Sequence, residues 1–226
     1  MNTIEDIRLY KSNRQDDMGN HIIHAFGDKK LNAMVHRIVM KLRERAFSFG
    51  EFDHLYIDFT TCDLEGNMKL SNKVDKYHPW YRYCFLKVED ALYQTLGALD
   101  TYQYIIDAIG DVLIHYFATG SFDRQFFCSC IGEAMEQGEN MLMKFKEKRT
   151  SKRKAFVYLR YLDTCRYFPL LRVYDTEDNL LLEKNLPEAL TLDYLGEIQL
   201  SMKKVTINPR KNCFTTGMVP ITIEYG

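Results

Sequence analysis

The sequence predicts an α+β protein whose helices and main antiparallel sheet occupy different parts of the chain. Apolar residues recur at helical spacing near the N-terminus and through the middle of the chain, whereas short alternating stretches dominate after residue 154. Segregated helices and strands favour an α+β arrangement over alternating parallel units. For 226 residues we expect one domain, with a possible subdivision into a mainly helical part, 1–150, and a β-rich part, 151–226.

The N-terminal helix is predicted over residues 29–47, after Asp28, whose carboxylate can cap the first turn. Gly50 ends the helical pattern. One side of this helix is expected to face the core and the other to face solvent. The apolar side comprises Leu31, Met34, Val35, Ile38, Leu42 and Ala46, and the basic side comprises Lys30, Arg37, Lys41 and Arg45.

A short pair of strands is predicted next, over residues 52–61 and 80–88, joined by a loop over residues 62–79. In the first strand Leu55, Ile57 and Phe59 alternate with polar residues, and they are expected to share one face because successive side chains of a strand point to opposite sides. The second strand is dense in aromatic residues and can pair with the first.

The central part of the chain is predicted to form three helices. These cover residues 89–98, 102–117 and 122–148. Ser121 is the expected cap of the third helix, although Gly132 and Gly138 weaken that pattern. His115 lies within the second helix, where we expect a hydrogen-bonded residue of the core or its boundary.

The last part of the chain is predicted to form a mostly antiparallel sheet, because stretches rich in Tyr, Phe, Val and Leu are separated by turn residues. One helical turn is expected over residues 187–195. The expected strands are 155–162, 168–174, 180–183, 196–201, 203–208 and 219–224.

The composition is typical of a soluble globular protein, with 46% hydrophobic residues, 27% charged residues and a formal net charge of -1. This charge disfavours a generally basic nucleic-acid binder. The first residues lack a basic segment followed by an apolar run, and the six cysteines are spread along the chain. We therefore expect a cytoplasmic protein with reduced thiols and no membrane span.

Metal-binding motifs are weak in this sequence. His21 with His24, and Cys128 with Cys130, are the two close pairs of soft ligands. Neither has the second pair that a tetrahedral zinc site needs, and the two cysteines would lie about 200° apart on a helix. We therefore expect no metal and no cofactor.

Catalytic motifs are equally weak. Asp53 and His54 are adjacent on a predicted strand, so we expect them to point to opposite faces and not to act together as acid and base. The carboxylates Asp58, Asp63 and Glu65 lie near the end of that strand, where a hydrolase can place them. No third anchoring motif accompanies them, which makes a polar strand face and loop the simpler interpretation.

Charge is gathered in two runs of opposite sign. Residues 144–154 carry seven basic side chains against one acid, Glu147, and residues 175–197 carry seven acids against one base, Lys184. The simpler interpretation is a helix C-terminus with a solvated linker for the first run, and polar turns for the second. The functional interpretation is a phosphate-contacting patch and a face that attracts a basic partner.

Aromatic residues gather around the only tryptophan, Trp80. Tyr77, Tyr81 and Tyr83 flank it at the junction between the predicted loop and the second strand. Tyrosine and tryptophan anchor protein interfaces because they join a large apolar area to a hydrogen-bonding tip. We expect Tyr77, Trp80 and Tyr81 to be the exposed anchors of a binding surface.

The stretch Phe52-Asp-His-Leu-Tyr-Ile-Asp-Phe-Thr60, followed by Trp80-Tyr-Arg-Tyr83, resembles the N-terminal pattern of some bacterial polymorphic-toxin immunity proteins. The likeness covers roughly forty residues and rests on aromatic spacing. Such proteins are small and cytosolic, and each neutralises a cognate toxin by binding it. The resemblance implies a protein-binding role, a toxin partner and a bacterial cytoplasm, and it transfers no catalytic residues because these proteins act by occlusion.

The leading hypothesis is therefore an immunity protein that occludes a cognate toxin, more probable than an enzyme. The partner-binding residues are expected to be Tyr77, Trp80, Tyr81, Asp175, Glu177, Asp178 and Glu183. Two alternatives stay open: a hydrolase-like enzyme on an unrecognised scaffold, using His54 or the nearby carboxylates, and a nucleic-acid-binding accessory protein using the basic run. The oligomeric state does not follow from the sequence.

Overall fold

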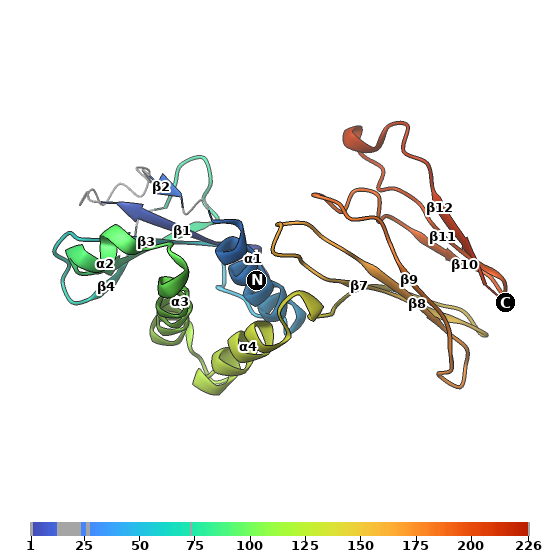
Figure 1. The fold of residues 1–226 in the computed structure, drawn as a ribbon, viewed down its shortest axis with the longest axis horizontal. Coiled ribbons are helices and arrows are strands. Elements are labelled where there is room, and N and C mark those ends of the chain that lie inside the picture. The colour runs from blue at the N-terminus through green and yellow to red at the C-terminus, as the bar shows by residue number, and fades with distance from the viewer. Residues whose placement is uncertain (1, 13–23, 26–27, 73, 226) are drawn as a thin grey trace. The chain divides into compact units, whose positions relative to one another are not determined.

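A computed structural model describes residues 2–12, 24–25, 28–72 and 74–225 of the chain. It confirms the α+β class and divides the chain into two compact units, Met1–Gly138 and Glu139–Gly226 (Figure 1). We call these the N-terminal unit and the C-terminal unit. All four α-helices of the described chain belong to the first, and two antiparallel sheets form the second.

The N-terminal unit is built on a five-stranded mixed sheet of order β2-β1-β3-β5-β4. Its strands are β1 (Asp6–Ser12), β2 (His24–Ala25), β3 (His54–Thr60), β4 (Met68–Leu70) and β5 (Tyr81–Lys87). The two strands expected near residues 52–61 and 80–88 do pair, and they pair in parallel. Strand β1, absent from the sequence predictions, lies parallel to β3 on its other side. The short strands β2 and β4 run antiparallel at the two edges.

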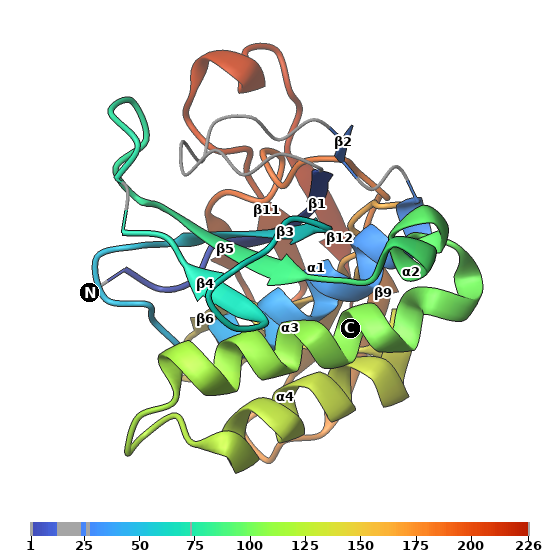
Figure 2. The same ribbon diagram turned by 90° about the vertical axis from the view of Figure 1, so that its left-hand side faces the viewer.

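Three of the four helices lie on one side of this sheet (Figure 2). The helices are α1 (Lys29–Glu44), α2 (Asp90–Thr95), α3 (Tyr102–Phe117) and α4 (Arg124–Gln137). Leu55, Ile57 and Phe59 of β3 are fully buried, as expected for the core face of the strand. Asp28 caps α1 as predicted, because its Oδ1 accepts the N–H of Leu31 at 2.8 Å.

A group of phenylalanines fills the end of this core. Phe47, which follows α1 and is completely buried, makes edge-to-face contacts with Phe49, Phe122 and Phe127. The ring centroids are 5.0–5.2 Å apart. This geometry places the positive edge of one ring against the negative face of the next, which adds to the stabilisation from burial.

The third predicted helix is too long and has the wrong cap. It begins after Asp123, whose Oδ1 accepts the N–H of Phe126, and not after Ser121. It ends at Gln137 because Gly138 adopts a φ of +52°, a left-handed value that suits glycine and stops a helix. Residues 143–149 form a strand instead. No helix forms over residues 187–195 either; that described stretch consists of turns and a single β-bridge.

Two cations on the expected solvent side of α1 are buried. Arg37 and Lys41 are 2% and 6% exposed, because α4 packs beside α1 and covers this side. The Nζ of Lys41 lies 2.7 Å from Glu44 and 3.5 Å from Glu133 of α4. Glu133 also pairs with Arg45 and accepts the hydroxyl of Ser129. A buried charge of this kind requires ionic partners, and the neighbouring helix supplies one.

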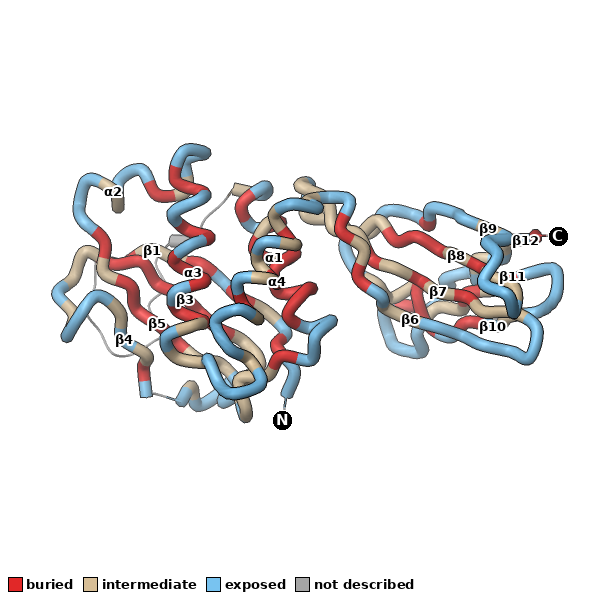
Figure 3. Tube along the Cα trace, turned by 90° about the horizontal axis from the view of Figure 1, so that it is seen from below, coloured by how far each residue is buried: buried red, intermediate tan, exposed pale blue. Residues whose placement is uncertain are grey.

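The C-terminal unit consists of a four-stranded and a three-stranded antiparallel sheet. The first has strands β6 (Met143–Arg149), β7 (Lys154–Leu159), β8 (Leu170–Tyr174) and β9 (Leu180–Asn185), and the second has β10 (Ile198–Leu200), β11 (Lys204–Ile207) and β12 (Ile221–Glu224). Buried and more exposed residues alternate along β7 and β8 (Figure 3). Val157 and Val173 are among the buried ones, and Val205 of β11 is buried in the second sheet, so each sheet contributes one face to the core.

Gly196 lies where the chain before β10 crosses the turn after β11. Its N–H donates to the carbonyl of Asn208 at 2.7 Å, and its own carbonyl accepts the ammonium of Lys146 at 2.7 Å. A Cβ at this position would lie 2.5 Å from backbone atoms of Asn208 and Pro209. Only glycine fits this contact without a shift of the backbone.

Candidate functional site

Aromatic residues just before β5 and at its first position form a defined structure, in which Tyr77, His78 and Trp80 are exposed whereas Tyr81, expected to be exposed, is half-buried. We call Tyr77, His78, Trp80 and Tyr81 the aromatic corner. The loop that carries them is held by Asp75, whose Oδ1 accepts the backbone N–H groups of Tyr77 and His78, each at 2.8 Å. An aspartate that binds the backbone two and three residues ahead fixes a turn. The side chains of the corner therefore start from a fixed backbone.

The rings of the corner have a specific mutual geometry. His78 stacks on Tyr81, with centroids 4.7 Å apart and planes 6° from parallel. Trp80 stands nearly perpendicular to both, at 5.7 Å from His78 and 6.1 Å from Tyr81. The indole is 39% exposed and Tyr77 is 76% exposed. The corner thus presents large aromatic surfaces to the outside in two perpendicular directions.

The corner is anchored to the parallel sheet beneath it. The carbonyl of Trp80 accepts the backbone N–H groups of Asp53 and His54 at 3.1 and 3.3 Å. The ring of Tyr81 contacts the rings of His54 and the buried Tyr56, with centroids 5.0 and 4.8 Å apart. Since β3 and β5 are paired in parallel, their first residues lie side by side and bring these rings together.

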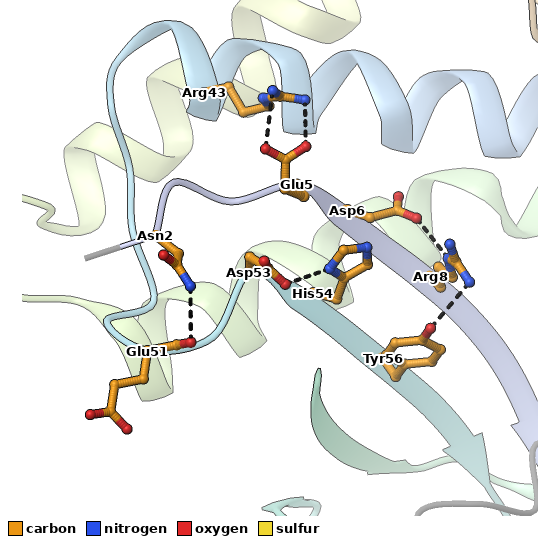
Figure 4. A network of polar contacts seen from close by, with 9 residues as sticks. All are labelled: Asn2, Glu5, Asp6, Arg8, Arg43, Glu51, Asp53, His54 and Tyr56. Atoms are coloured by element: carbon orange, nitrogen blue, oxygen red, sulfur yellow. Dashed lines mark hydrogen bonds and ion pairs between the residues drawn. The ribbon is translucent and has the colours of Figure 1, made fainter. Parts of the chain in front are cut away.

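Side chains of β1 and β3 form a network of polar contacts around His54 and Tyr56 (Figure 4). The guanidinium of Arg8 donates to Asp6 at 2.6 Å and to the hydroxyl of Tyr56 at 3.1 Å. Burial raises the pKa of Tyr56 and raises that of Tyr83 to about 12. Both phenols are therefore neutral near pH 7, where they serve as packing and hydrogen-bonding groups.

Asp53 and His54 contact each other, which corrects the expectation that they point apart. The Nδ1 atom of His54 lies 2.6 Å from Oδ1 of Asp53. Asp53 precedes the first residue of β3, so the alternation of a strand does not govern its side chain. The carboxylate can fix the orientation of the imidazole, in the manner of an orienting acid.

The carboxylates proposed for a hydrolase do not join this pair. Asp58 is buried and lies four residues further along β3, which is roughly 13 Å at the rise of a strand. Asp63 is exposed and pairs with Lys87 at 2.6 Å, and Glu65 is also exposed. The described residues therefore do not bring these acids and His54 into one group.

The predicted acidic anchors lie in the other unit and are largely engaged there. Asp178 pairs with Lys154 at 2.7 Å, and Glu183 pairs with Arg172 at 2.7 Å. Asp175 accepts the N–H groups of Glu177 and Asn179 and so fixes the turn between β8 and β9. Much of the acidic run thus neutralises basic residues of the same sheet or shapes its turn.

The basic run also has structural partners. It forms β6, the following turn and the start of β7, and not a helix end with a linker. Glu147 pairs with both Lys144 and Arg149, and the ammonium of Lys146 binds the Gly196 carbonyl. This run is therefore only partly available to a phosphate backbone.

The proposed soft-ligand pairs are separated. Cys130 is buried on α4 whereas Cys128 is exposed, as their spacing predicts, and His21 lies outside the described residues. No group of three or more possible metal ligands occurs within the described part of the chain. His115 is exposed on α3 against the ring of Tyr116, which corrects its expected core position.

Comparisons of the chain with models of protein families, with curated proteins and with solved structures find no match. Of the described helices, none has the length and apolar character needed to cross a bilayer.

The sequence analysis missed the roles of Asp75 and His78 in the aromatic corner. The spacing of an aspartate two residues before Tyr77, with proline after His78, is the turn signal that points to them.

Proposed function

We propose that this protein works by binding another protein through the aromatic corner, and specifically that it neutralises a bacterial toxin by covering the surface on which the toxin depends. One observation carries the proposal. Exposed aromatic side chains are fixed in place by a turn, a ring stack and backbone hydrogen bonds to β3.

Such an arrangement favours association for a physical reason. Burying tyrosine and tryptophan at an interface removes a large apolar area from water, and these side chains have few rotatable bonds to immobilise. A surface that is already ordered loses less conformational entropy on binding. Tyr77, at 76% exposed, contributes little to the packing of its own unit, so its ring is available to a partner.

The acidic residues of the C-terminal unit have a smaller part in this proposal. Glu177 is exposed at the tip of the β8–β9 turn, whereas Asp178 and Glu183 already have basic partners. Exposed charges attract a partner at long range, so they change the association rate and its salt dependence more than the affinity. We assign them to steering a basic partner, with the anchoring done by Tyr77, Trp80 and Tyr81.

The test is co-expression with the product of the neighbouring gene as the candidate toxin. We expect the unmodified protein to restore growth and to co-purify with the toxin, and we expect the double variant Tyr77→Ala/Trp80→Ala to lose both properties. The matched control is Tyr104→Ala/Phe214→Ala, which removes rings of 38% and 77% exposure elsewhere. Protection that survives in the first variant, or that is absent in the unmodified protein, would contradict the proposal.

A further inference from the structure

We infer that the aromatic corner is a binding site for a cation, and that its occupant is an arginine side chain of the partner. This inference deepens the proposed function, on which it rests for the identity of the site. It comes from the ring geometry, from the way neighbouring rings are used, and from the local charge.

The ring geometry provides aromatic faces in two directions. The centroid of Trp80 is nearly equidistant from the two stacked rings, at 5.7 and 6.1 Å, and its plane is 89° and 86° from theirs. The indole therefore stands beside the stack, not on top of it. A cation that lies against Trp80 can also touch an imidazole or phenol ring, so that more than one π system stabilises it.

Neighbouring rings show that cations and aromatic faces already pair in this unit. Lys76 lies over Tyr77 at 5.7 Å from the centroid. Arg82 lies over Phe52 at 4.8 Å, and Arg8 lies over Tyr56 at 5.5 Å.

Trp80 differs from these rings. No lysine or arginine among residues 2–12, 24–25, 28–72 and 74–225 lies over its indole, although tryptophan attracts cations more strongly than tyrosine or phenylalanine. As far as the described residues extend, the strongest cation-binding ring of the unit is therefore open to a partner.

One carboxylate lies beside the rings of the corner. Asp75 accepts hydrogen bonds from the backbone of His78 and Tyr77, which lowers the pKa of its carboxyl group below its usual value. The carboxylate is therefore ionised at neutral pH, and it lies 3.5 Å from Nδ1 of His78. Two cations next to the corner in the sequence, Lys76 and Arg82, lie over Tyr77 and Phe52.

Arginine fits this site better than lysine. Its guanidinium group is flat and weakly hydrated, so it can stack on the indole while its N–H groups still reach acceptors at the edge. A lysine ammonium is compact and strongly hydrated, and it gives up more solvation to make the same contact. We therefore expect the site to prefer arginine over lysine, and either cation over a neutral group of the same shape.

The only tryptophan of the chain makes this preference measurable without a partner protein. The 226-residue chain labelled with ¹⁵N shows one indole N–H signal, which needs no assignment. We would titrate it with N-acetyl-arginine methylamide, with the lysine equivalent, and with the citrulline equivalent, which is neutral and nearly isosteric with arginine, at constant ionic strength.

We expect saturable shifts of the indole signal with an affinity for arginine about 2–5-fold higher than for citrulline, as an exposed cation–π contact provides. Lysine should fall between them. Equal affinities for arginine and citrulline, or no shift with arginine, would overturn the cation site. An affinity for lysine equal to or above that for arginine would overturn the assignment of arginine.

A variant separates the role of the indole from general attraction by the carboxylate. In Trp80→Leu, followed through the backbone amide of Tyr81, we expect the preference for arginine over citrulline to disappear. Tyr104→Leu, with a ring of matching exposure on α3, should keep it. A preference that survives in Trp80→Leu would contradict the inference. Because no toxin is present, failure here leaves the growth test of the proposed function unaffected, and the reverse also holds.

Discussion

The two units use the same chemistry, aromatic rings and cations, in different ways. In the C-terminal unit, Phe156 of β7 lies under both Lys144 and Arg149. Arg172 lies over Tyr158 of the same strand, and Arg160 lies over Phe168, which precedes β8. In the N-terminal unit, Trp80 stands exposed with a fixed orientation. Rings of the sheet are thus covered by cations of their own unit, whereas no lysine or arginine of the described residues covers Trp80.

The units also differ in how they are stabilised, and the largest expected effect tests that difference. We expect Phe47→Ala to lower the free energy of unfolding of the N-terminal unit by about 3–5 kcal/mol, because it removes a fully buried ring from a group of aromatic contacts. Trp80 fluorescence during urea unfolding reports this unit alone. If Phe47→Ala accelerates amide exchange in β7 and β8 as much as in the N-terminal unit, the two units unfold together and are not stabilised separately.

Gly196→Ala tests the other unit. The new Cβ would meet backbone atoms at 2.5 Å, so we expect a loss of about 2–3 kcal/mol and faster amide exchange in β10 and β11. Gly132→Ala in α4 is the control, since a Cβ there meets nothing within 4 Å. It should stabilise the N-terminal unit by up to about 1 kcal/mol through helix propensity. A neutral Gly196→Ala would show that the turn after β11 moves aside easily.

Local patterns were sufficient to predict the α+β class, the first helix with its Asp28 cap and most of the C-terminal strands. These patterns failed where a segment distant in the sequence determines the burial of a side chain or the pairing of a strand. Arg37 and Lys41 looked solvent-exposed because nothing in α1 itself indicates that α4 will cover them. Strand β1 was missed because Asp6, Arg8 and Lys11 make it look like a polar leader, whereas β3 pairs with it from about fifty residues away.

The position of the aromatic corner followed from the sequence, but its geometry did not. Trp80 and its tyrosines were recognised by composition alone. The stack of His78 on Tyr81 and the hydrogen bond that the Asp53 carboxylate accepts from His54 lie where β5 starts beside β3, and this pairing is a long-range property. The two charge runs were visible as well. The ion pair that joins them, between Lys154 and Asp178, required knowing that β7 and β8 are neighbours in one sheet.

Histidines distinguish the units in their response to pH. All six lie in the first 115 residues, so the C-terminal unit has none. Burial lowers the pKa of His36 to about 4 from an ordinary value of 6.5. Between these values the unfolded chain binds a proton that the folded unit does not, so stability falls as the pH decreases from 6.5 to 4.

We expect His36→Gln to remove this part of the pH dependence, with an effect of about 1–2 kcal/mol at pH 4 because the side chain is only partly buried. The measurement is urea unfolding of the N-terminal unit from pH 7 to pH 4. If the free energy of unfolding of the variant falls with pH as steeply as that of the original protein, groups other than His36 cause the loss of stability. The amide exchange of the C-terminal unit should not respond to the substitution.

The smallest expected effect concerns the ion pairs between α1 and α4. Glu133→Gln keeps the size of the side chain and removes the charge that faces Lys41 and Arg45. We expect a loss of about 1 kcal/mol at pH 7, since Glu133 is one-third exposed and Lys41 retains Glu44. The interactions that lower the pKa of Glu133 make this contribution present at neutral pH and lost as the pH falls below about 4.5. A variant as stable as the original protein would show that Glu44 alone is enough to stabilise the buried charge of Lys41.

Asp75 lies between the loop residues before it and the stack of His78 on Tyr81. Its hydrogen bonds to the N–H groups of Tyr77 and His78 fix the backbone that leads into the stack. Exposed positions ahead of it, such as Asn72 and Val74, can therefore change without disturbing the stack or the strands below. Substitutions at these positions should therefore be tolerated by the fold, whereas loss of the Asp75 carboxylate should loosen the backbone from which the rings project.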